Sequence, residues 1–284
     1  EIDRKGQSHF MIEKTFRTGL GTIHYWINDI DSTQLTLVFL PGLTADNRLF
    51  EKQIEYFSGK YNCFVWDAPA HGKSRPFELK FSMEDMAKYL YDIFQVENIS
   101  KPVLIGQSLG GYISQVFMEI FPYSASGFVS IDSCSLKRKY YTWWELVLLK
   151  RTKWMYMSFP WKLLLKLGIV ETSKTEYGRK VMKETWACYE KIEYCELSAH
   201  GSRIFAESVE ADKPYDIKCP ILLLCGTNDN AGSAKSYNRR WAKQDGHNLV
   251  WLKGAGHNSN TDMPEKVNQL IDEFIQKEVL VLPN

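Results

Sequence analysis

Several common sequence features are missing from this chain, and each absence excludes a class of protein. The six cysteines form no C-x-x-C pair, and none lies with histidine at the spacing of a zinc site. No apolar run approaches the roughly 20 residues that span a bilayer. Internal repeats and low-complexity linkers are absent too. These absences exclude zinc-finger, membrane-spanning and repeat proteins, and they indicate reduced thiols packed in a core.

The start of the chain has no apolar stretch of the kind found in signal peptides, because residues 1–13 are mostly polar and charged. We therefore expect a cytoplasmic protein. Met11 is a candidate natural start. Residues 1–10 are interpreted as a tag remnant or a disordered N-terminus and are left out of the fold prediction.

Net charge is nearly absent, since 35 Lys and Arg face 34 Asp and Glu. The balance hides an asymmetry. The segment 136–166 has one acidic residue and eight basic ones, so it carries +7 and leaves −6 for the rest of the chain. The same segment holds eight aromatic residues. The basic residues are Lys137, Arg138, Lys139, Lys150, Arg151, Lys153, Lys162 and Lys166.

Short apolar runs alternate with helical patterns along most of the 284 residues. Runs of this kind predict buried strands, and the alternation predicts an α/β fold with a mostly parallel, doubly wound sheet of about eight strands. The predicted strands are Thr22–Asn28, Leu35–Leu40, Tyr61–Trp66, Pro102–Ile105, Gly127–Ile131, Pro220–Cys225 and Asn248–Leu252. The clearest predicted helices are Ser82–Val96, Leu109–Phe121 and Pro264–Gln276.

One long segment breaks the alternation. Residues 134–212 have a mainly helical pattern and lie between two predicted strands. We therefore predict a core domain built from 11–133 and 213–278, with a helical insertion over 134–212.

The sequence Gly106-Gln107-Ser108-Leu109-Gly110 fits the pattern G-x-S-x-G. This pattern is weak in isolation, but a predicted strand runs into it and a predicted helix runs out of it. That context is typical of a nucleophile elbow, the tight turn that exposes a reactive serine. Small residues at Gly106 and Gly110 suit its crowded backbone. Ser108 is therefore the candidate nucleophile.

A serine hydroxyl needs a base to take its proton. His257 lies just beyond the last predicted strand, in a loop at the carboxyl edge of the sheet, where sites form in open parallel sheets. A third group, an acid, must orient the base. Asp229 follows a strand at the same edge, and Asp132 at the end of the preceding strand is an alternative. The order Ser108, Asp229, His257 is that of the α/β-hydrolase triad.

These residues give the chain a resemblance to α/β-hydrolase-fold proteins with a cap domain, and it covers nearly everything from Phe16 to Gln276. The landmarks are Leu40–Leu43, Asp67–Ser74, the elbow and the two loops with Asp229 and His257. Pro41 stands where many members have histidine, and Ala70 replaces a frequent glycine.

The resemblance implies a serine hydrolase that cleaves a carboxylic ester, a lactone or a thioester through an acyl-enzyme. It also implies an oxyanion hole made by the backbone N–H groups of Leu43 and Leu109. Such a reaction requires no metal or organic cofactor.

The resemblance further implies that the insertion over 134–212 is a cap above the nucleophile. Trp143, Trp144, Trp154 and Tyr156 are then candidates to line a pocket for the apolar or aromatic part of a small-molecule substrate. The nearby basic residues suit an anionic substrate or peripheral contact with an anionic membrane. A solvated face over a small helical core is an equally good interpretation. No motif indicates nucleic-acid binding.

Two rival functions remain open at this point. The same fold and triad serve C–C bond hydrolases and a menaquinone-pathway synthase, whose anionic substrates suit a basic cap. The fold also serves hormone receptors that bind a ligand without catalysis.

Overall fold

The computed structural model describes residues 11–28 and 34–281, and it confirms the predicted α/β class. Eight strands form one sheet in the order β1-β2-β4-β3-β5-β6-β7-β8. Strand β2 is antiparallel to both of its neighbours, and the strands from β4 to β8 are parallel. The strands are β1 (Ile12–Arg17), β2 (Thr22–Ile27), β3 (Thr36–Leu40), β4 (Asn62–Trp66), β5 (Val103–Gln107), β6 (Gly127–Ile131), β7 (Ile221–Gly226) and β8 (Asn248–Leu252).

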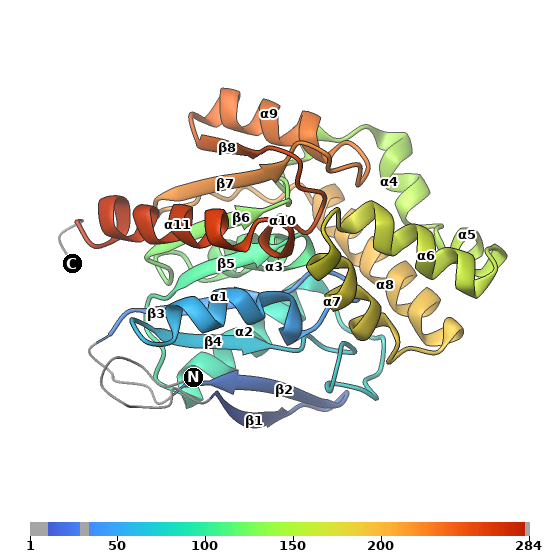
Figure 1. Ribbon diagram of the computed structural model, residues 1–284, viewed down its shortest axis with the longest axis horizontal. Coiled ribbons are helices and arrows are strands. Elements are labelled where there is room, and N and C mark those ends of the chain that lie inside the picture. Colours follow the sequence, from blue (N-terminus) through green and yellow to red (C-terminus); the bar gives the residue numbers. More distant parts are fainter. Residues whose placement is uncertain (1–10, 29–33, 282–284) are drawn as a thin grey trace.

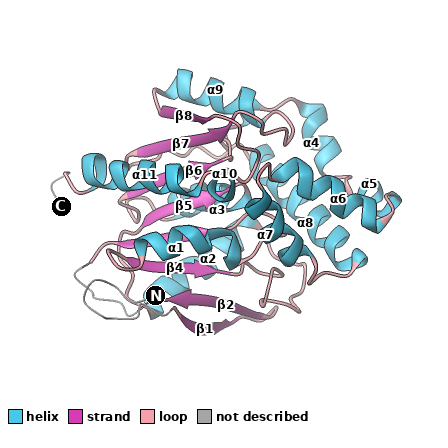
Figure 2. Ribbon diagram, in the orientation of Figure 1, coloured by secondary structure: helices cyan, strands magenta, loops and turns pink. Residues whose placement is uncertain are grey.

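Helices cover both faces of the sheet, so the five central strands β3 to β7 are buried at every position. In Figure 1, α1 and α11 lie in front of the sheet and α2 and α3 lie behind it. Figure 2 shows the same layers by type of structure. The helices of the core are α1 (Glu51–Phe57), α2 (Met83–Val96), α3 (Leu109–Ile120), α9 (Ala234–Asp245), α10 (Ser259–Asp262) and α11 (Pro264–Phe274), with short turns η1 (Asn47–Phe50) and η3 (Ile275–Val279).

Local sequence signals set the ends of these helices. Ser82 accepts from the N–H of Asp85, and the Asp85 carboxylate accepts from the N–H of Ser82, which closes a capping box at the start of α2. Pro264 opens α11, where a missing N–H costs nothing. Helix α3 ends at Ile120, just before Pro122. All three predicted helices are found within two residues of their expected ends.

The strand pattern of the sequence does not reveal β1. Its residues Ile12–Arg17 are exposed or half-buried because this strand lies at the edge of the sheet and has only one neighbour. Three charged side chains in six residues obscure its alternation. The other seven strands match their predicted ranges within two residues.

The chain between β6 and β7 is helical, and Figure 1 shows its helices beyond the carboxyl ends of the parallel strands. Helices α4 and α5 both contact α8, and α6 contacts α7. Among the described residues, no helix is long and apolar enough to cross a membrane. The first ten residues, interpreted above as a tag remnant, lie outside the described ranges. The elements are η2 (Arg138–Tyr140), α4 (Trp143–Leu149), α5 (Lys153–Ser158), α6 (Trp161–Thr172), α7 (Glu176–Trp186) and α8 (Lys191–Glu210).

Candidate active site

Ser108 occupies a strained turn between β5 and α3. Its backbone has φ 48° and ψ −114°, a conformation that residues with a side chain rarely adopt. The Ser108 N–H donates to the carbonyl of Ile131 at the end of β6 (2.9 Å), which holds the turn against the sheet. The strain presents the hydroxyl at the carboxyl edge of the strands, as a nucleophile elbow does.

Glycines surround this turn because the backbone leaves no room for a Cβ. A Cβ on Gly106 would lie 2.4 Å from the carbonyl carbon of Gly110. A Cβ on Gly110 would lie 1.8 Å from the backbone oxygen of Leu40. Since both obstacles are backbone atoms, neither can rotate away. These contacts give the physical reason for the two outer positions of the G-x-S-x-G pattern.

The structure brings His257 and Asp229 to Ser108. The Nε2 atom of His257 lies 2.9 Å from the Oγ of Ser108, and its Nδ1 lies 3.0 Å from Oδ2 of Asp229. The Asp229 side chain is fully buried, and its other oxygen accepts from the N–H of Ala231. A carboxylate on Nδ1 holds the imidazole with Nε2 free to accept the serine proton.

Asp132, the alternative acid, has a different set of partners. One of its oxygens accepts from the N–H of Gly226, at the end of β7. The other accepts from both the N–H and the hydroxyl of Ser259, two residues after His257. Asp132 therefore connects the loop that carries Asp229 with the loop that carries His257, without contacting the imidazole by a hydrogen bond. The geometry leaves Asp229 as the partner of His257.

Two residues that the sequence did not single out hold the His257 loop in place. Gln107, next to the nucleophile, donates from Nε2 to the His257 carbonyl (2.7 Å) and to the side chain of Asn258. The Asp262 carboxylate accepts from the N–H of Gly256. Position 107 is a free position of the elbow pattern and Asp262 lies outside every motif, so neither carried a sequence signal.

Charges in the site shift the titration of its buried groups. Burial alone favours the neutral imidazole of His257, but the charge and hydrogen bond of Asp229 outweigh it and raise its pKa above 6.5. Burial and the neighbouring charge of Asp229 raise the pKa of Asp132 well above that of an exposed carboxyl. His257 is thereby stabilised as an imidazolium, the form that a general base reaches after taking a proton.

The loop after β3 borders the nucleophile. A Cβ on Gly42 would lie 3.2 Å from the Cβ of Ser108, so the backbone of this loop passes directly beside the serine. Within the described residues, neither the N–H of Leu43 nor that of Leu109 has a hydrogen-bond acceptor. Leu109 follows the serine as the first residue of α3, where an N–H has no partner within the helix.

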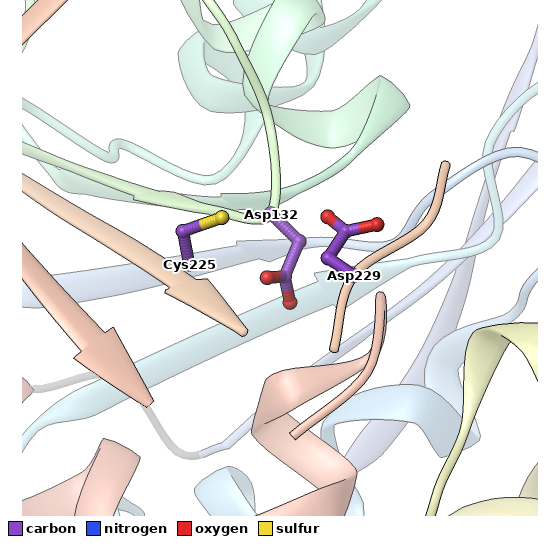
Figure 3. A group of neighbouring side chains, drawn as sticks. All are labelled: Asp132, Cys225 and Asp229. Carbon is purple, nitrogen blue, oxygen red and sulfur yellow. The ribbon is translucent and has the colours of Figure 1, made fainter. Parts of the chain in front are cut away.

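Asp132, Cys225 and Asp229 form a compact buried group (Figure 3) in which one ligand atom from each lies within 4.8 Å of the others. The group does not fit a metal site. Both carboxylates already accept hydrogen bonds from the chain, and burial raises the pKa of the Cys225 thiol, which disfavours the thiolate that binds metals.

Comparison with known families identifies the fold. A family model described as the alpha/beta hydrolase fold matches residues 36–264. The chain belongs to this family. The match includes the elbow, both strand-end aspartates and His257, and it confirms the resemblance noted in the sequence.

Named relatives of this α/β hydrolase are distant. A hydrolase of (E)-2-((N-methylformamido)methylene)succinate from Acinetobacter baylyi is 24% identical over 94% of this chain and 99% of its own length. Among solved structures, a carboxylesterase from Nitrososphaera gargenis has a TM-score of 0.74 at 14% identity and covers 93% of this chain and 98% of its own. An enol-lactonase from Burkholderia xenovorans LB400 has a TM-score of 0.74 at 16% identity, with 90% and 97% coverage. These likenesses support an α/β-hydrolase enzyme.

The three tryptophans predicted to line a pocket are largely exposed to solvent in this α/β hydrolase. Trp143, Trp144 and Trp154 are 70%, 54% and 67% exposed. They lie on α4 and α5, and the sequence could not show which way these short helices face. The fourth candidate, Tyr156, is half-buried and packs toward the core.

Helix α8 is one of the inserted helices that approach the site. A Cβ on Gly201 would lie 2.4 Å from the side chain of Leu43, so α8 packs closely on the loop beside Ser108. One turn along, the ring of Phe205 lies 4.3 Å from that of Tyr112, which is four residues after Ser108 in α3. Sequence reasoning missed both residues of α8 because its helical pattern resembles that of any buried helix.

Four of the eight basic residues in the segment 136–166 form ion pairs with three carboxylates from outside it. Lys137 and Lys139 both pair with Asp245 of α9. The other two pairs join the segment 136–166 to α8 and are Lys150–Glu210 and Lys153–Glu196. The asymmetry of +7 against −6 in the sequence is therefore partly cancelled in space.

Proposed function

We propose that this protein is a serine hydrolase that cleaves a carboxylic ester, lactone or thioester with Ser108, His257 and Asp229 as its catalytic triad. The observation that carries the proposal is the continuous chain of hydrogen bonds from the Ser108 hydroxyl through His257 to Asp229, at 2.9 and 3.0 Å. The strained turn at Ser108 and the raised pKa of His257 support the same roles.

The reaction has two halves. The Ser108 Oγ attacks the carbonyl carbon while His257 takes its proton, and the resulting tetrahedral intermediate collapses as His257 donates that proton to the leaving alcohol or thiol. Water then adds to the acyl-enzyme with His257 again acting as base, which releases the acid and restores the serine. Asp229 orients His257 and stabilises its charged form throughout.

The oxyanion of each tetrahedral intermediate is assigned to the N–H groups of Leu43 and Leu109. Both donors lie beside Ser108 and both are unpaired within the described chain. Donors held in place before the reaction stabilise the developing charge without a reorganisation cost, and loss of one typically slows such reactions by about 10²–10³-fold.

Helices α4–α8 are proposed to act as a cap that bounds the substrate pocket. Helix α8 contacts Leu43 in the loop beside Ser108, and its Phe205 contacts Tyr112, four residues after Ser108 in α3. We infer a small-molecule substrate whose acyl group or leaving group has an apolar or aromatic part.

A fluorophosphonate probe tests this proposal directly, since such probes react with an activated serine. We expect one adduct on Ser108, measured by mass spectrometry, together with hydrolysis of a short p-nitrophenyl ester. Ser108→Ala should lose both, whereas Ser236→Ala, which removes an exposed hydroxyl on α9, should lose neither. Absence of an adduct on the folded wild-type protein would instead support a ligand-binding protein without catalysis.

A second candidate is a substrate that carries carboxylates. It is favoured by the relative from Acinetobacter baylyi, which is named for a succinate derivative and aligns along nearly the whole chain. C–C bond hydrolysis and synthase chemistry on anionic compounds belong to the same alternative. A panel that compares neutral esters with carboxylate-bearing esters and diketones separates the candidates by their kcat/KM.

A further inference from the structure

Helices α5 and α6 are surface helices with an unusual composition. Every residue of Lys153–Ser158 and Trp161–Thr172 remains at least partly exposed. Both helices are nevertheless rich in large apolar side chains, including Trp154 and the run Leu163-Leu164-Leu165. A helix that is apolar on more than one side normally lies inside a protein or against a membrane.

Helix α6 has two apolar faces. Trp161, Leu164, Leu165 and Ile169 face inward and pack on the core, and Gly168 allows close contact with the ring of Trp186 on α7. Leu163, Leu167 and Val170 form the opposite face, which we call the outer face of α6. They recur at positions i, i+4 and i+7 and are 43%, 46% and 40% exposed.

Basic side chains accompany the outer face. Lys162 and Lys166 lie beside it on α6, and Arg151 precedes α5. Within the described residues, these three cations make no ion pair, unlike Lys150 and Lys153. The only acidic residue between 150 and 172 is Glu171, so the stretch of chain that carries the outer face has a net positive charge.

We propose that the outer face of α6, together with the exposed Trp154 of α5, docks on the surface of an anionic lipid membrane. Apolar side chains in the headgroup region and flanking Lys and Arg against anionic lipids are the two contributions that hold interfacial helices. Charge selects this occupant over a second copy of the chain, because a symmetric dimer through α6 would place its unpaired lysines close together.

The docked surface connects to the catalytic site through hydrogen bonds. The Thr172 carbonyl at the end of α6 accepts from the N–H of Asn258, the residue after His257. The Asn258 side chain also donates to the hydroxyl of Ser173. If the proposed hydrolase function holds, membrane docking places the cap of the enzyme against substrates dissolved in lipid, so this inference extends the substrate class to esters that partition into membranes.

Vesicle flotation of the full chain carrying Ser108→Ala tests docking without any dependence on catalysis. We expect it to bind phosphatidylcholine vesicles that contain phosphatidylglycerol, and to bind pure phosphatidylcholine vesicles about tenfold less. The variant Leu163→Gln, Leu167→Gln, Val170→Gln should reduce binding about tenfold or more, since it removes the outer face and keeps good helix formers.

A charge variant separates the two contributions. Arg151→Gln, Lys162→Gln, Lys166→Gln should abolish the preference for anionic vesicles. The matched control, Lys88→Gln, Lys101→Gln, Lys243→Gln, removes three exposed lysines from the core domain and should retain it. The apolar control, Ile12→Gln with Val96→Gln, removes two exposed side chains from the core domain and should leave binding unchanged.

The proposal is overturned if the wild-type surface binds neither kind of vesicle, or if both outer-face and control variants bind equally well. It is also overturned if sedimentation velocity finds a dimer that the Leu163, Leu167 and Val170 substitutions dissociate, with no vesicle binding. Hydrolysis of a short soluble ester, measured on the same substitutions with Ser108 intact, should stay unchanged and shows that they fold. If the wild-type protein does not hydrolyse the ester, the proposed hydrolase function is overturned, and the vesicle result still tests docking.

Discussion

Asp132 and Asp229 end adjacent strands with carboxylate oxygens less than 4.8 Å apart, yet only Asp229 hydrogen-bonds His257. Asp132 instead accepts from the loops on either side of the imidazole, at Gly226 and Ser259. The two carboxylates therefore have separable effects: Asp229 contacts His257 directly, and Asp132 holds together the loops that carry Asp229 and His257.

Substitution of each aspartate distinguishes these roles. Asp229→Asn should lower kcat by about 10⁴-fold, because an amide supports the wrong imidazole tautomer. Asp132→Asn should weaken one or two of the hydrogen bonds that position the loops. We expect this to raise the activation free energy by about 1–2 kcal/mol, which lowers kcat/KM by about tenfold. Steady-state kinetics on a short ester measures both. Equal losses in the two variants would contradict the assignment.

The pH dependence of the reaction follows from His257. In the proposed mechanism its neutral form is the base. Because its pKa is raised above 6.5, kcat/KM should fall as the pH decreases through that raised pKa and should be constant above it. Asp132 contributes to the increase through its charge, so Asp132→Asn should move the acidic limb to lower pH. A pH–rate profile between about pH 5 and pH 9 provides the measurement. An acidic limb below 6.5 in the wild type is the contrary result.

The elbow should tolerate no side chain at its outer glycines. Gly110→Ala forces a Cβ against the Leu40 backbone, and we expect a loss of about 2–4 kcal/mol in the free energy of unfolding. Gly19→Ala is the matched control, because nothing lies within 4 Å of its Cβ position. Urea denaturation of the two variants should differ by this amount. Similar midpoints would show that the turn can relax.

Asp262 should couple the inserted helices to the His257 loop. Its carboxylate accepts from the N–H groups of Lys174 and Thr175, between α6 and α7, and from the N–H of Gly256. Asp262→Asn removes some of these hydrogen bonds and should lower the free energy of unfolding by about 1–3 kcal/mol. Hydrogen exchange should then accelerate in both loops together, whereas exposed Asp216→Asn should change neither. Acceleration in one loop alone would argue against coupling.

The sequence predicted the residues of the proposed triad better than the surroundings of the site. Ser108 and His257 were found because a strand, a tight turn and a strand-end loop leave local signals. The chain order favours Asp229 over Asp132 as the acid but does not exclude Asp132, since both follow neighbouring strands and only the path of the loops decides which one reaches the imidazole.

The prediction that tryptophans line a pocket is less specific for a related reason. The sequence placed Trp143, Trp144 and Trp154 in the insertion but not on a particular side of it, because short helices take their orientation from what they pack against. The contact of α8 with the loop beside Ser108 is made at Gly201, which has no side chain to attract notice. Edge strand β1 was missed because a half-solvated strand needs few apolar residues.

The inserted helices are fastened to the rest of the chain by different kinds of contact. The junction of α6 and α7 is tied to the histidine loop by buried polar groups of Asn258 and Asp262. At the junction of α4 and α5, the contacts with α8 include the ion pairs of Lys150 and Lys153. These pairs are exposed, so each contributes little to the free energy of folding. We therefore expect local opening of the insertion to start near the junction of α4 and α5, while the junction of α6 and α7 stays held against the loop of His257.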